Sequence, residues 1–310
     1  MTDRDVLVLG ASGLLGSAVV RSRPARTWSA TDVRWADPGA DRRIRRIVSS
    51  FVADRTDCAV AWCAGVSIIG AGTAHLDAET ALVRALLESL GDRKDVTVFL
   101  ASSAGGVHGS RSEGDITEST PPTPISDYGR GKLDQERAVA SWAAATGARA
   151  VVGRIATLYG PGQSTNKSQG IISALCGSAI THEPVPIYVP LDTIRDFTFV
   201  DDAATRIHGS IDLAASAPEG STTTKLIASF RSASIGTVIA TAARVCHRPP
   251  LVVHGSSPNR RMHGDALTFR STVWPELDRV SSMPLPAGIH ATWRTMLAHR
   301  IGGRTADQHR

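Results

Sequence analysis

Residues 5–16 read DVLVLGASGLLG and decide the fold of the first half of the chain. The apolar run Asp5–Leu9 leads directly into a turn with glycine at Gly10, Gly13 and Gly16, and apolar residues at helical spacing follow. Glycine at these positions permits a tight turn and a close approach of the backbone to a pyrophosphate, while the first amides of the helix supply partial positive charge. The stretch predicts a strand, turn and helix that bind a dinucleotide. The alternative is a turn that only packs strand against helix.

Short apolar runs then alternate with helix-period segments, which is typical of a parallel sheet wrapped by helices. The expected strands are Asp5–Leu9, Thr27–Val33, Cys58–Cys63, Val96–Ser102 and Ala150–Ile155. The expected helices are Leu14–Arg21, Asp41–Asp54, Asp77–Leu90 and Tyr128–Thr146. The fold class is therefore α/β, a Rossmann-like doubly wound parallel sheet with a smaller C-terminal substrate-binding region.

The segment after the second strand is unusually short. Only 25 residues separate Asp32 from Cys58, and the helix from Asp41 takes most of them. We expect the usual third strand to be missing, so that the strand ending at Asp32 lies at the edge of the sheet. The expected domains are 1–160 for the dinucleotide, with 190–212 returning to it, then 161–189 and 213–302 for the substrate, and 303–310 as a flexible tail.

Asp32 indicates which dinucleotide is bound. It follows Gly10 by 22 residues and ends the second strand, where a carboxylate accepts hydrogen bonds from a ribose 2′-hydroxyl and repels a 2′-phosphate. NAD is therefore favoured over NADP. The nearby Arg34 weakens this preference. The residues expected to contact NAD are Gly10, Ser12, Gly13, Leu14, Leu15, Gly16, Asp32, Ala64, Gly65, Tyr128 and Lys132.

A tyrosine and a lysine four residues apart, Tyr128 and Lys132, share one face of a predicted helix. A phenol with the ordinary tyrosine pKa of about 10 is a poor base, and an adjacent ammonium with an oxidised nicotinamide favours its phenolate. This spacing alone is common by chance and also fits a plain amphipathic helix. Ser103, however, follows the fourth sheet strand at its carboxyl end, where open α/β sheets bind ligands. Ser103, with Ser102 as its competitor, would hydrogen-bond the reacting substrate oxygen.

Five motifs in order resemble the NAD-dependent epimerase/dehydratase family of extended short-chain dehydrogenases over nearly the whole chain. They are GASGLLG at Gly10, SSAGGVHG at Ser102, YGRGK at Tyr128, GRIATLYGPGQ at Gly153 and RDFTFVDDAA at Arg195. The resemblance implies that Ser103, Tyr128 and Lys132 form the catalytic set and that Lys132 also holds the nicotinamide ribose. It implies that the turn Tyr159–Gly162 closes the site.

The resemblance also places the substrate. It implies that Arg195 grips the nucleotide diphosphate, a task that suits a guanidinium, whereas the alternative is a structural salt bridge to Asp196 or Asp201. Arg261, near Arg260 and Asp265, is expected at the substrate nucleotide. The residues expected to contact substrate are Ser103, Ala104, Thr157, Arg195 and Arg261.

Three departures from the family pattern affect these roles. The helix after Gly65 has Glu79 or Thr80 where the family usually has an asparagine that organises water, and Thr157 replaces another asparagine that contacts substrate. The acidic residue that contacts adenine after the third strand has no counterpart, which agrees with the shortened segment.

The resemblance implies an NAD-dependent epimerase that oxidises a ring hydroxyl of a nucleotide sugar transiently. Two alternatives stay open: an NAD(P)-dependent ketoreductase of a keto sugar or related carbonyl, and a non-catalytic NAD(H)-binding regulatory protein on the same fold. In the family's dehydratases an Asp-Glu pair follows the catalytic hydroxyl residue, whereas Ala104 and Gly105 follow Ser103 here. We therefore expect no dehydration.

Two helices, Asp77–Leu90 and Tyr128–Thr146, carry more apolar positions than one sheet face can cover, including Leu82, Leu86, Trp142 and Ala143. Together with the family resemblance, this predicts a homodimer through a four-helix bundle.

Composition excludes several other classes. The 310 residues are 42% hydrophobic and 20% charged, with a net charge of +5. The basic residues form no long run, so we expect no nucleic-acid partner. The four cysteines lack CxxC or histidine spacing, which predicts neither a metal site nor a disulfide framework. No apolar run approaches the roughly 18 residues that span a bilayer, so we expect no membrane contact and a cytoplasmic location.

Overall fold

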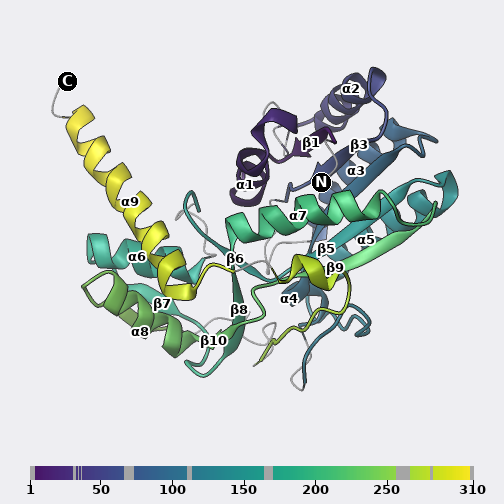
Figure 1. Ribbon diagram of the computed structural model, residues 1–310. Helices are drawn as coiled ribbons and strands as arrows, with labels where there is room; N and C mark the ends of the chain where they lie inside the picture. Colours follow the sequence, from purple (N-terminus) through teal and green to yellow (C-terminus); the bar gives the residue numbers. More distant parts are fainter. Residues whose placement is uncertain are drawn as a thin grey trace.

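The larger part of the molecule is a parallel sheet of six strands in the order β2-β1-β3-β4-β5-β9, with helices on both faces (Figure 1). Its strands are β1 (Val6–Leu9), β2 (Thr27–Ala30), β3 (Cys58–Trp62), β4 (Val96–Ser103), β5 (Arg149–Ile155) and β9 (Thr222–Ile227). The computed structural model describes residues 4–30, 33, 35, 37–65, 73–109, 114–163, 170–255, 266–279 and 282–307, the last six by backbone alone.

Each face of this sheet has its own apolar core, because successive strand residues point to opposite sides. Val8 packs with Phe99 and Ile207 on one face, while Leu9 packs with Leu86 on the other. The helices on the first face are α1 (Leu14–Ser22) and α7 (Val200–Ala214), and those on the second are α2 (Ala40–Ala53), α3 (Thr73–Leu90) and α5 (Asp127–Thr146).

Strand β2 lies at the edge of the sheet, as the 25-residue spacing predicts. Among the described residues it pairs with β1 alone, and α2 is the next element described. The described strand is Thr27–Ala30, and Val33, the last residue of the expected strand, lies outside it. Trp35 beyond it packs edge-on against Trp62, with ring centroids 5.4 Å apart, so the indole ring lies against the end of β3.

The sixth strand, β9, is missing from the strands expected from the sequence. Its residues, TTTKLI, include Lys225, whose side chain is fully buried, so the usual apolar signature of a parallel strand is interrupted. Residues 222–227 were expected in the substrate-binding region 213–302, but β9 pairs in register with β5 and belongs to the central sheet.

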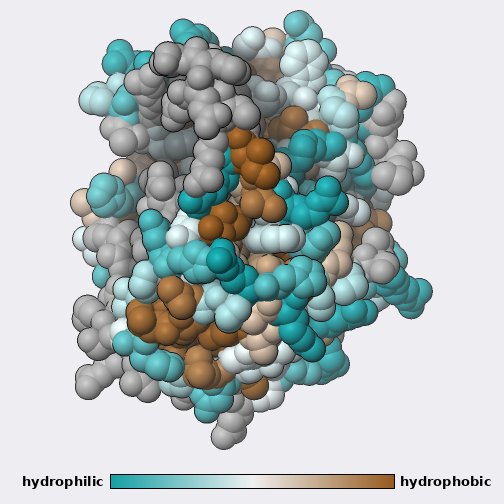
Figure 2. Space-filling model, turned by 90° about the vertical axis from the view of Figure 1, so that its left-hand side faces the viewer, coloured by the Kyte–Doolittle hydropathy of each residue, from teal (hydrophilic) through white to brown (hydrophobic). Residues whose placement is uncertain are grey.

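The C-terminal region has a separate apolar core that includes Tyr159, Leu175 and Phe197. A three-stranded sheet, a two-stranded sheet and three helices surround it, and Figure 2 shows separate apolar patches among hydrophilic side chains on the side of the molecule that carries α6 and α8. Its elements are β6 (Thr157–Tyr159), α6 (Ile171–Thr181), β7 (Val185–Ile187), β8 (Ile194–Phe199), β10 (Ser232–Ser234), α8 (Ile235–Val245), β11 (Val252–His254) and α9 (Leu285–Asp307).

The end of the chain differs from the expectation. Helix α9 continues to Asp307, so the flexible tail expected from 303 is helical over its first five residues. Glycine costs only about 1 kcal/mol in a helix, so the pair Gly302 and Gly303 does not end this one. Among the described residues, no helix is both long enough and apolar enough to cross a membrane.

Candidate active site

The glycine-rich turn joins β1 to α1 through contacts that exclude a side chain. Gly10 has a φ of 90°, and a Cβ atom on it would lie 2.7 Å from the Ala64 nitrogen. A Cβ on Gly16 would lie 2.1 Å from the Gly10 carbonyl oxygen. Gly13 caps α1 without a side-chain hydrogen bond, and the first turn, which begins at Leu14, contains no acidic residue. The helix N-terminus is therefore suited to an anionic group.

The end of β3 connects this turn to the second group of candidate residues. Ala64 packs against Gly10, and a Cβ on the next residue, Gly65, would lie 3.7 Å from Lys132 Nζ. Ala64 and Gly65, both expected to contact NAD, thus lie between the glycine turn and the lysine.

Ser103 and Tyr128 lie on either side of Gly106. Ser103 caps the short helix α4 (Ala104–Val107), and its Oγ accepts a hydrogen bond from the Gly106 nitrogen at 3.1 Å. A Cβ on Gly106 would lie 2.8 Å from the Tyr128 ring and 3.3 Å from Ser103 Oγ. Only glycine lets the hydroxyl and the phenol ring approach each other this closely.

Ser102, the competing candidate, is directed into the protein. Its Oγ donates to Glu136 Oε1 at 2.5 Å, and Arg154 donates to both carboxylate oxygens, with its Nη2 2.8 Å from Glu136 Oε2. The same guanidinium lies 3.2 Å from His108 Nε2, which must accept because arginine only donates. This buried group of four side chains ties β4, β5, α4 and α5 together beneath Ser103, and the geometry favours Ser103 over Ser102 at the site.

Helix α5 carries Tyr128 in its first turn. Ser126 caps it by accepting a hydrogen bond from the Gly129 nitrogen at 3.1 Å. A Cβ on Gly129 would lie 2.1 Å from the Gly106 carbonyl oxygen, so α5 packs directly on the backbone of α4. The sequence YGRGK therefore needs its first glycine for packing, in addition to its tyrosine and lysine.

Lys132 is buried, and its ammonium is held by two side chains. Nζ donates to Glu79 Oε1 at 2.8 Å and to Gln135 Oε1 at 3.1 Å, and it lies 5.9 Å from the centroid of the Tyr128 ring. Burial acts to lower the pKa of Lys132, but the neighbouring Tyr128 and Glu79 outweigh burial, so this pKa is raised above the ordinary lysine value. Of the two residues left open in the sequence, Glu79 rather than Thr80 contacts the lysine.

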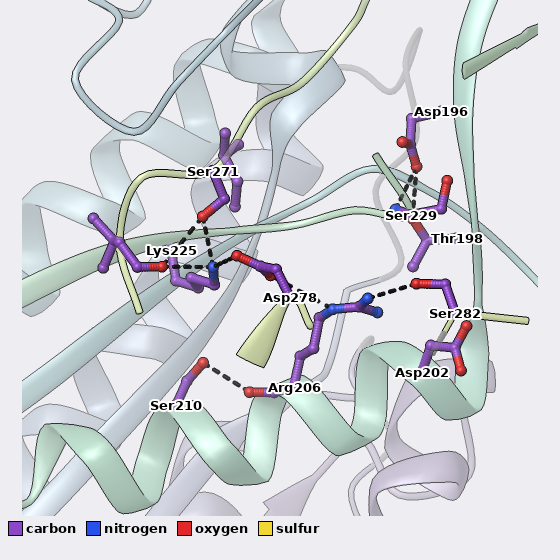
Figure 3. Close-up of polar contacts among 12 residues, drawn as sticks. Asp196, Thr198, Asp202, Arg206, Ser210, Lys225, Ser229, Ser271, Asp278 and Ser282 are labelled. Carbon is purple, nitrogen blue, oxygen red and sulfur yellow. Dashed lines mark hydrogen bonds and ion pairs between the residues drawn. The ribbon is translucent and has the colours of Figure 1, made fainter. Parts of the chain in front are cut away.

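The candidate substrate residues Thr157 and Arg195 lie on adjacent strands of the three-stranded sheet. Exposed Thr157 on β6 pairs with Phe197 on β8, two residues beyond half-buried Arg195. The carboxylates proposed as structural partners of Arg195 also contact other groups. Asp196 accepts hydrogen bonds from Thr198 and from the Ser229 nitrogen (Figure 3), and from the Arg231 nitrogen. Asp201 pairs with Arg21.

Several expectations for the site stay predictions, including closure by the turn Tyr159–Gly162. Tyr159, the first residue of that turn, is 1% exposed and packs against Phe199 in the C-terminal core. Asp32 and Arg261 lie outside the described residues, as do Arg34, Arg260 and Asp265. Their roles stay predictions.

A family model described as the NAD dependent epimerase/dehydratase family matches residues 6–223. The chain belongs to this family.

Curated relatives include both reaction types. A dTDP-L-rhamnose 4-epimerase of Burkholderia thailandensis is 38% identical over 89 residues, which cover 28% of this chain and 24% of the relative. A dTDP-glucose 4,6-dehydratase of Xanthomonas campestris is 31% identical over 127 residues, which cover 38% of this chain and 35% of the relative. The chain thus matches about a quarter to a third of the length of these relatives.

Solved structures share the fold over almost the whole chain. MoeE5 in complex with UDP-glucose and NAD superposes with a TM-score of 0.78 at 22% identity, covering 95% of this chain and 99% of MoeE5. UDP-glucuronic acid 4-epimerase from Bacillus cereus, in complex with UDP-glucuronic acid and NAD, superposes with a TM-score of 0.79 at 18% identity over the same shares. At these identities the likeness shows the fold alone.

The glycine-rich turn between β1 and α1 has the features needed to bind NAD, the cofactor of this family. The turn Gly10–Gly16 has room only for backbone at Gly10 and Gly16, and its helix end lacks a capping side chain and an acidic first turn. Gly65 itself places no side chain above Lys132. These residues fit NAD.

Proposed function

We propose that this protein is an NAD-dependent epimerase that acts on a nucleotide sugar through transient oxidation of a ring hydroxyl. The observation that supports it best is that Ser103 and the Tyr128 ring meet at Gly106 at the carboxyl end of β4, with Lys132 Nζ 5.9 Å from the centroid of that ring. A hydroxyl, a phenol and a buried ammonium at this place fit the removal and return of a proton on a ring oxygen. NAD, when bound, supplies the hydride acceptor and donor.

Each of these side chains has one task in the proposal. Ser103 hydrogen-bonds the substrate oxygen, and Tyr128 takes its proton and later returns it. Lys132 stabilises the phenolate by charge and holds the nicotinamide ribose. Arg195 and Thr157 face the substrate from β8 and β6, with Arg195 assigned to the diphosphate and Arg261 to the nucleotide.

The described carboxylates favour epimerisation over dehydration. The two residues after Ser103 cannot move a proton: Ala104 is buried, and Gly105 faces Leu267. Farther along, Asp115 pairs with Arg270, and Glu118 accepts hydrogen bonds from Leu226, Ser271 and Thr272. An acid and a base for the loss of water are therefore unsupported among these groups.

A thermal-shift screen of nucleotide sugars with NAD present, followed by product analysis of each hit, tests the proposal. We expect one class of nucleotide sugar to raise Tm and to equilibrate with its epimer without net change in NADH absorbance. Stoichiometric consumption of NADH would identify a ketoreductase instead. Binding of NAD with no response to any nucleotide sugar would favour a non-catalytic protein.

Mass spectrometry of the same reactions tests dehydration. We expect no product lighter by one water. A time-dependent product of that mass, absent from a Tyr128→Phe control, would assign the chain to the dehydratases and overturn the expectation.

The proposed assembly is a homodimer through α3 and α5. Fewer apolar side chains are available for this interface than the sequence suggests. Leu86 and Ala143 are fully buried against the sheet of their own chain, because both helices cover that face closely. Leu82 and Trp142 are only partly buried and remain available to a partner.

A further inference from the structure

Three side chains form a closed hydrogen-bonded group beneath Gly65. Lys132 Nζ donates to Glu79 Oε1 at 2.8 Å and to Gln135 Oε1 at 3.1 Å, and Gln135 Nε2 donates to the same Glu79 oxygen at 3.2 Å. Each pair of the three is therefore joined directly. Glu79 comes from α3, whereas Lys132 and Gln135 lie one turn apart on α5.

The group is almost completely removed from solvent. The side chains of Lys132 and Glu79 are 6% and 5% exposed, and Gln135 is fully buried. A buried ammonium without a carboxylate would be costly, and the position of its charge is set by whatever pairs with it. Glu79 therefore fixes where the Lys132 charge sits and, together with Tyr128, opposes the lowering of the Lys132 pKa by burial.

We propose that Glu79 is a positioning residue that, with Gln135, holds the Lys132 ammonium in place before NAD binds and leaves one N–H donor for the cofactor ribose or the Tyr128 oxygen. An ammonium has three donors, and two are committed to the side chains named. In turnover this role rests on the proposed function, but the clamp itself is a property of the protein with or without substrate.

The charge balance around Lys132 makes the proposal measurable. In the described chain the charged or titratable groups that act on it are Glu79 from α3 and Tyr128 and Glu136 from α5, while Gly65 contributes only backbone from the end of β3. Glu136 is itself engaged by Arg154. Replacing Glu79 by glutamine keeps the shape of the side chain but removes the anion that is hydrogen-bonded to Lys132. The lowering of the Lys132 pKa by burial is then opposed less strongly.

A second buried lysine supplies a matched control. Lys225 on β9 is fully buried, and its Nζ lies 2.5 Å from Asp278 Oδ2 and 2.6 Å from Ser271 Oγ (Figure 3). Burial lowers the pKa of Lys225 despite the neighbouring Asp278. Asp278→Asn thus neutralises a lysine partner as Glu79→Gln does, but in a different part of the molecule.

Lysine-selective 13C NMR of the Cε resonances tests the clamp without any substrate. The chain has four lysines, Lys94, Lys132, Lys167 and Lys225, so each signal can be assigned by substitution. In the wild type we expect Lys132 to titrate above the ordinary range. Glu79→Gln should lower the pKa of Lys132 by about one unit or more and leave Lys225 unchanged, and Asp278→Asn should do the reverse. The wild-type titration keeps the test decisive if a variant fails to fold.

Binding of NAD between pH 7 and 10, measured by calorimetry, is the second readout. The wild type should bind with nearly constant affinity, whereas Glu79→Gln should lose about tenfold or more at the alkaline end, where its Lys132 becomes neutral. Asp278→Asn should follow the wild type.

Unchanged titration of Lys132 in Glu79→Gln, or an ordinary lysine titration in the wild type, would overturn the proposal. These outcomes are separate from the fate of the proposed function. If the NMR and NAD results are as expected but no nucleotide sugar is converted, the clamp stands and the epimerase assignment falls.

Discussion

Tyr128 offers the most direct test at the residue scale. Its ring packs against Gly106, so Tyr128→Phe removes the proton-transferring oxygen and keeps the packing. Turnover should fall by about 10² or more, while NAD affinity stays nearly unchanged. Steady-state kinetics on an accepted nucleotide sugar, with calorimetric NAD binding alongside, check both parts. Near-full turnover in the variant would show that another group moves the proton.

Lys132→Ala should damage stability as well as function. It leaves Glu79 buried without its ammonium partner, which costs about 3–5 kcal/mol, and both turnover and NAD affinity should fall. The pKa of Lys132 is raised in the folded state. The Lys132–Glu79 pair therefore stabilises the folded protein fully at every pH below the ordinary lysine pKa of about 10.4. This stabilisation is lost only as the pH rises through the raised pKa. Urea unfolding should therefore show the variant less stable than the wild type at both pH 6 and pH 9. A difference that vanishes at pH 9 would contradict this.

The positions of single site residues were predictable from sequence where the residues belong to a motif at the end of a strand or the start of a helix. The positions of Ser103 and Tyr128 follow from their places at the end of β4 and in the first turn of α5, and their catalytic roles stay predictions. The pairing of Glu79 with Lys132 was not predictable, because these residues lie 53 positions apart on two helices and no spacing rule reports which side chains meet there. Nor did the sequence decide between Ser102 and Ser103, since both fit the strand end until the Glu136 contact is seen.

At the element scale, α9 is placed by one glycine. A Cβ on Gly288 would lie 2.1 Å from the Tyr159 hydroxyl, and the ring is too buried to move aside. Gly288→Ala should destabilise the protein by about 1–3 kcal/mol through overpacking. Gly177→Ala on α6 is the control, since its Cβ would meet Met296 at an ordinary 3.5 Å; it should be neutral or stabilise by up to about 1 kcal/mol.

The hydroxyl of Tyr159 provides the complementary variant. It has no hydrogen-bond partner among the described residues, so Tyr159→Phe should cost little alone. It should relieve only part of the effect of Gly288→Ala, because the ring atoms Cζ and Cε2 would still lie 2.7 and 2.8 Å from the new Cβ. Thermal unfolding of the two single variants and the double variant measures this coupling. Additive losses would show that the helix shifts by another route.

Elements were predictable where burial follows the ordinary pattern. The strands from β1 to β5 and the helices α1, α2, α3 and α5 have apolar repeats, and their ends were predicted to within a few residues, whereas the short helix α4 was not expected. Strand β9 was not, because Lys225 is stabilised there by Asp278, Ser271 and the Val273 carbonyl, which lie far along the chain. A lysine satisfied by distant partners is indistinguishable in sequence from a solvent-facing one.

At the scale of the whole molecule, the open question is the number of subunits. The proposed α3 and α5 interface includes Leu82 and Trp142, and we expect light scattering at micromolar protein to give the mass of a dimer. Leu82→Glu should shift that mass toward the monomer without loss of NAD binding, because Leu82 is only partly covered in its own chain. A monomer mass for the wild type would remove the homodimer from the proposal.

The position of β2 at the rim of the sheet affects how the molecule behaves among its own copies. A rim strand offers unpaired backbone groups to any neighbouring chain, and long, flat, apolar rims promote aggregation. Here the strand has only four residues, its Trp28 side chain is 50% exposed, and the Arg55 guanidinium lies over that indole at 4.3 Å from the ring centroid. A short rim with a positive charge resting on its one large apolar side chain is a poor template for a second copy, so this edge of the sheet does not favour the addition of strands from another chain.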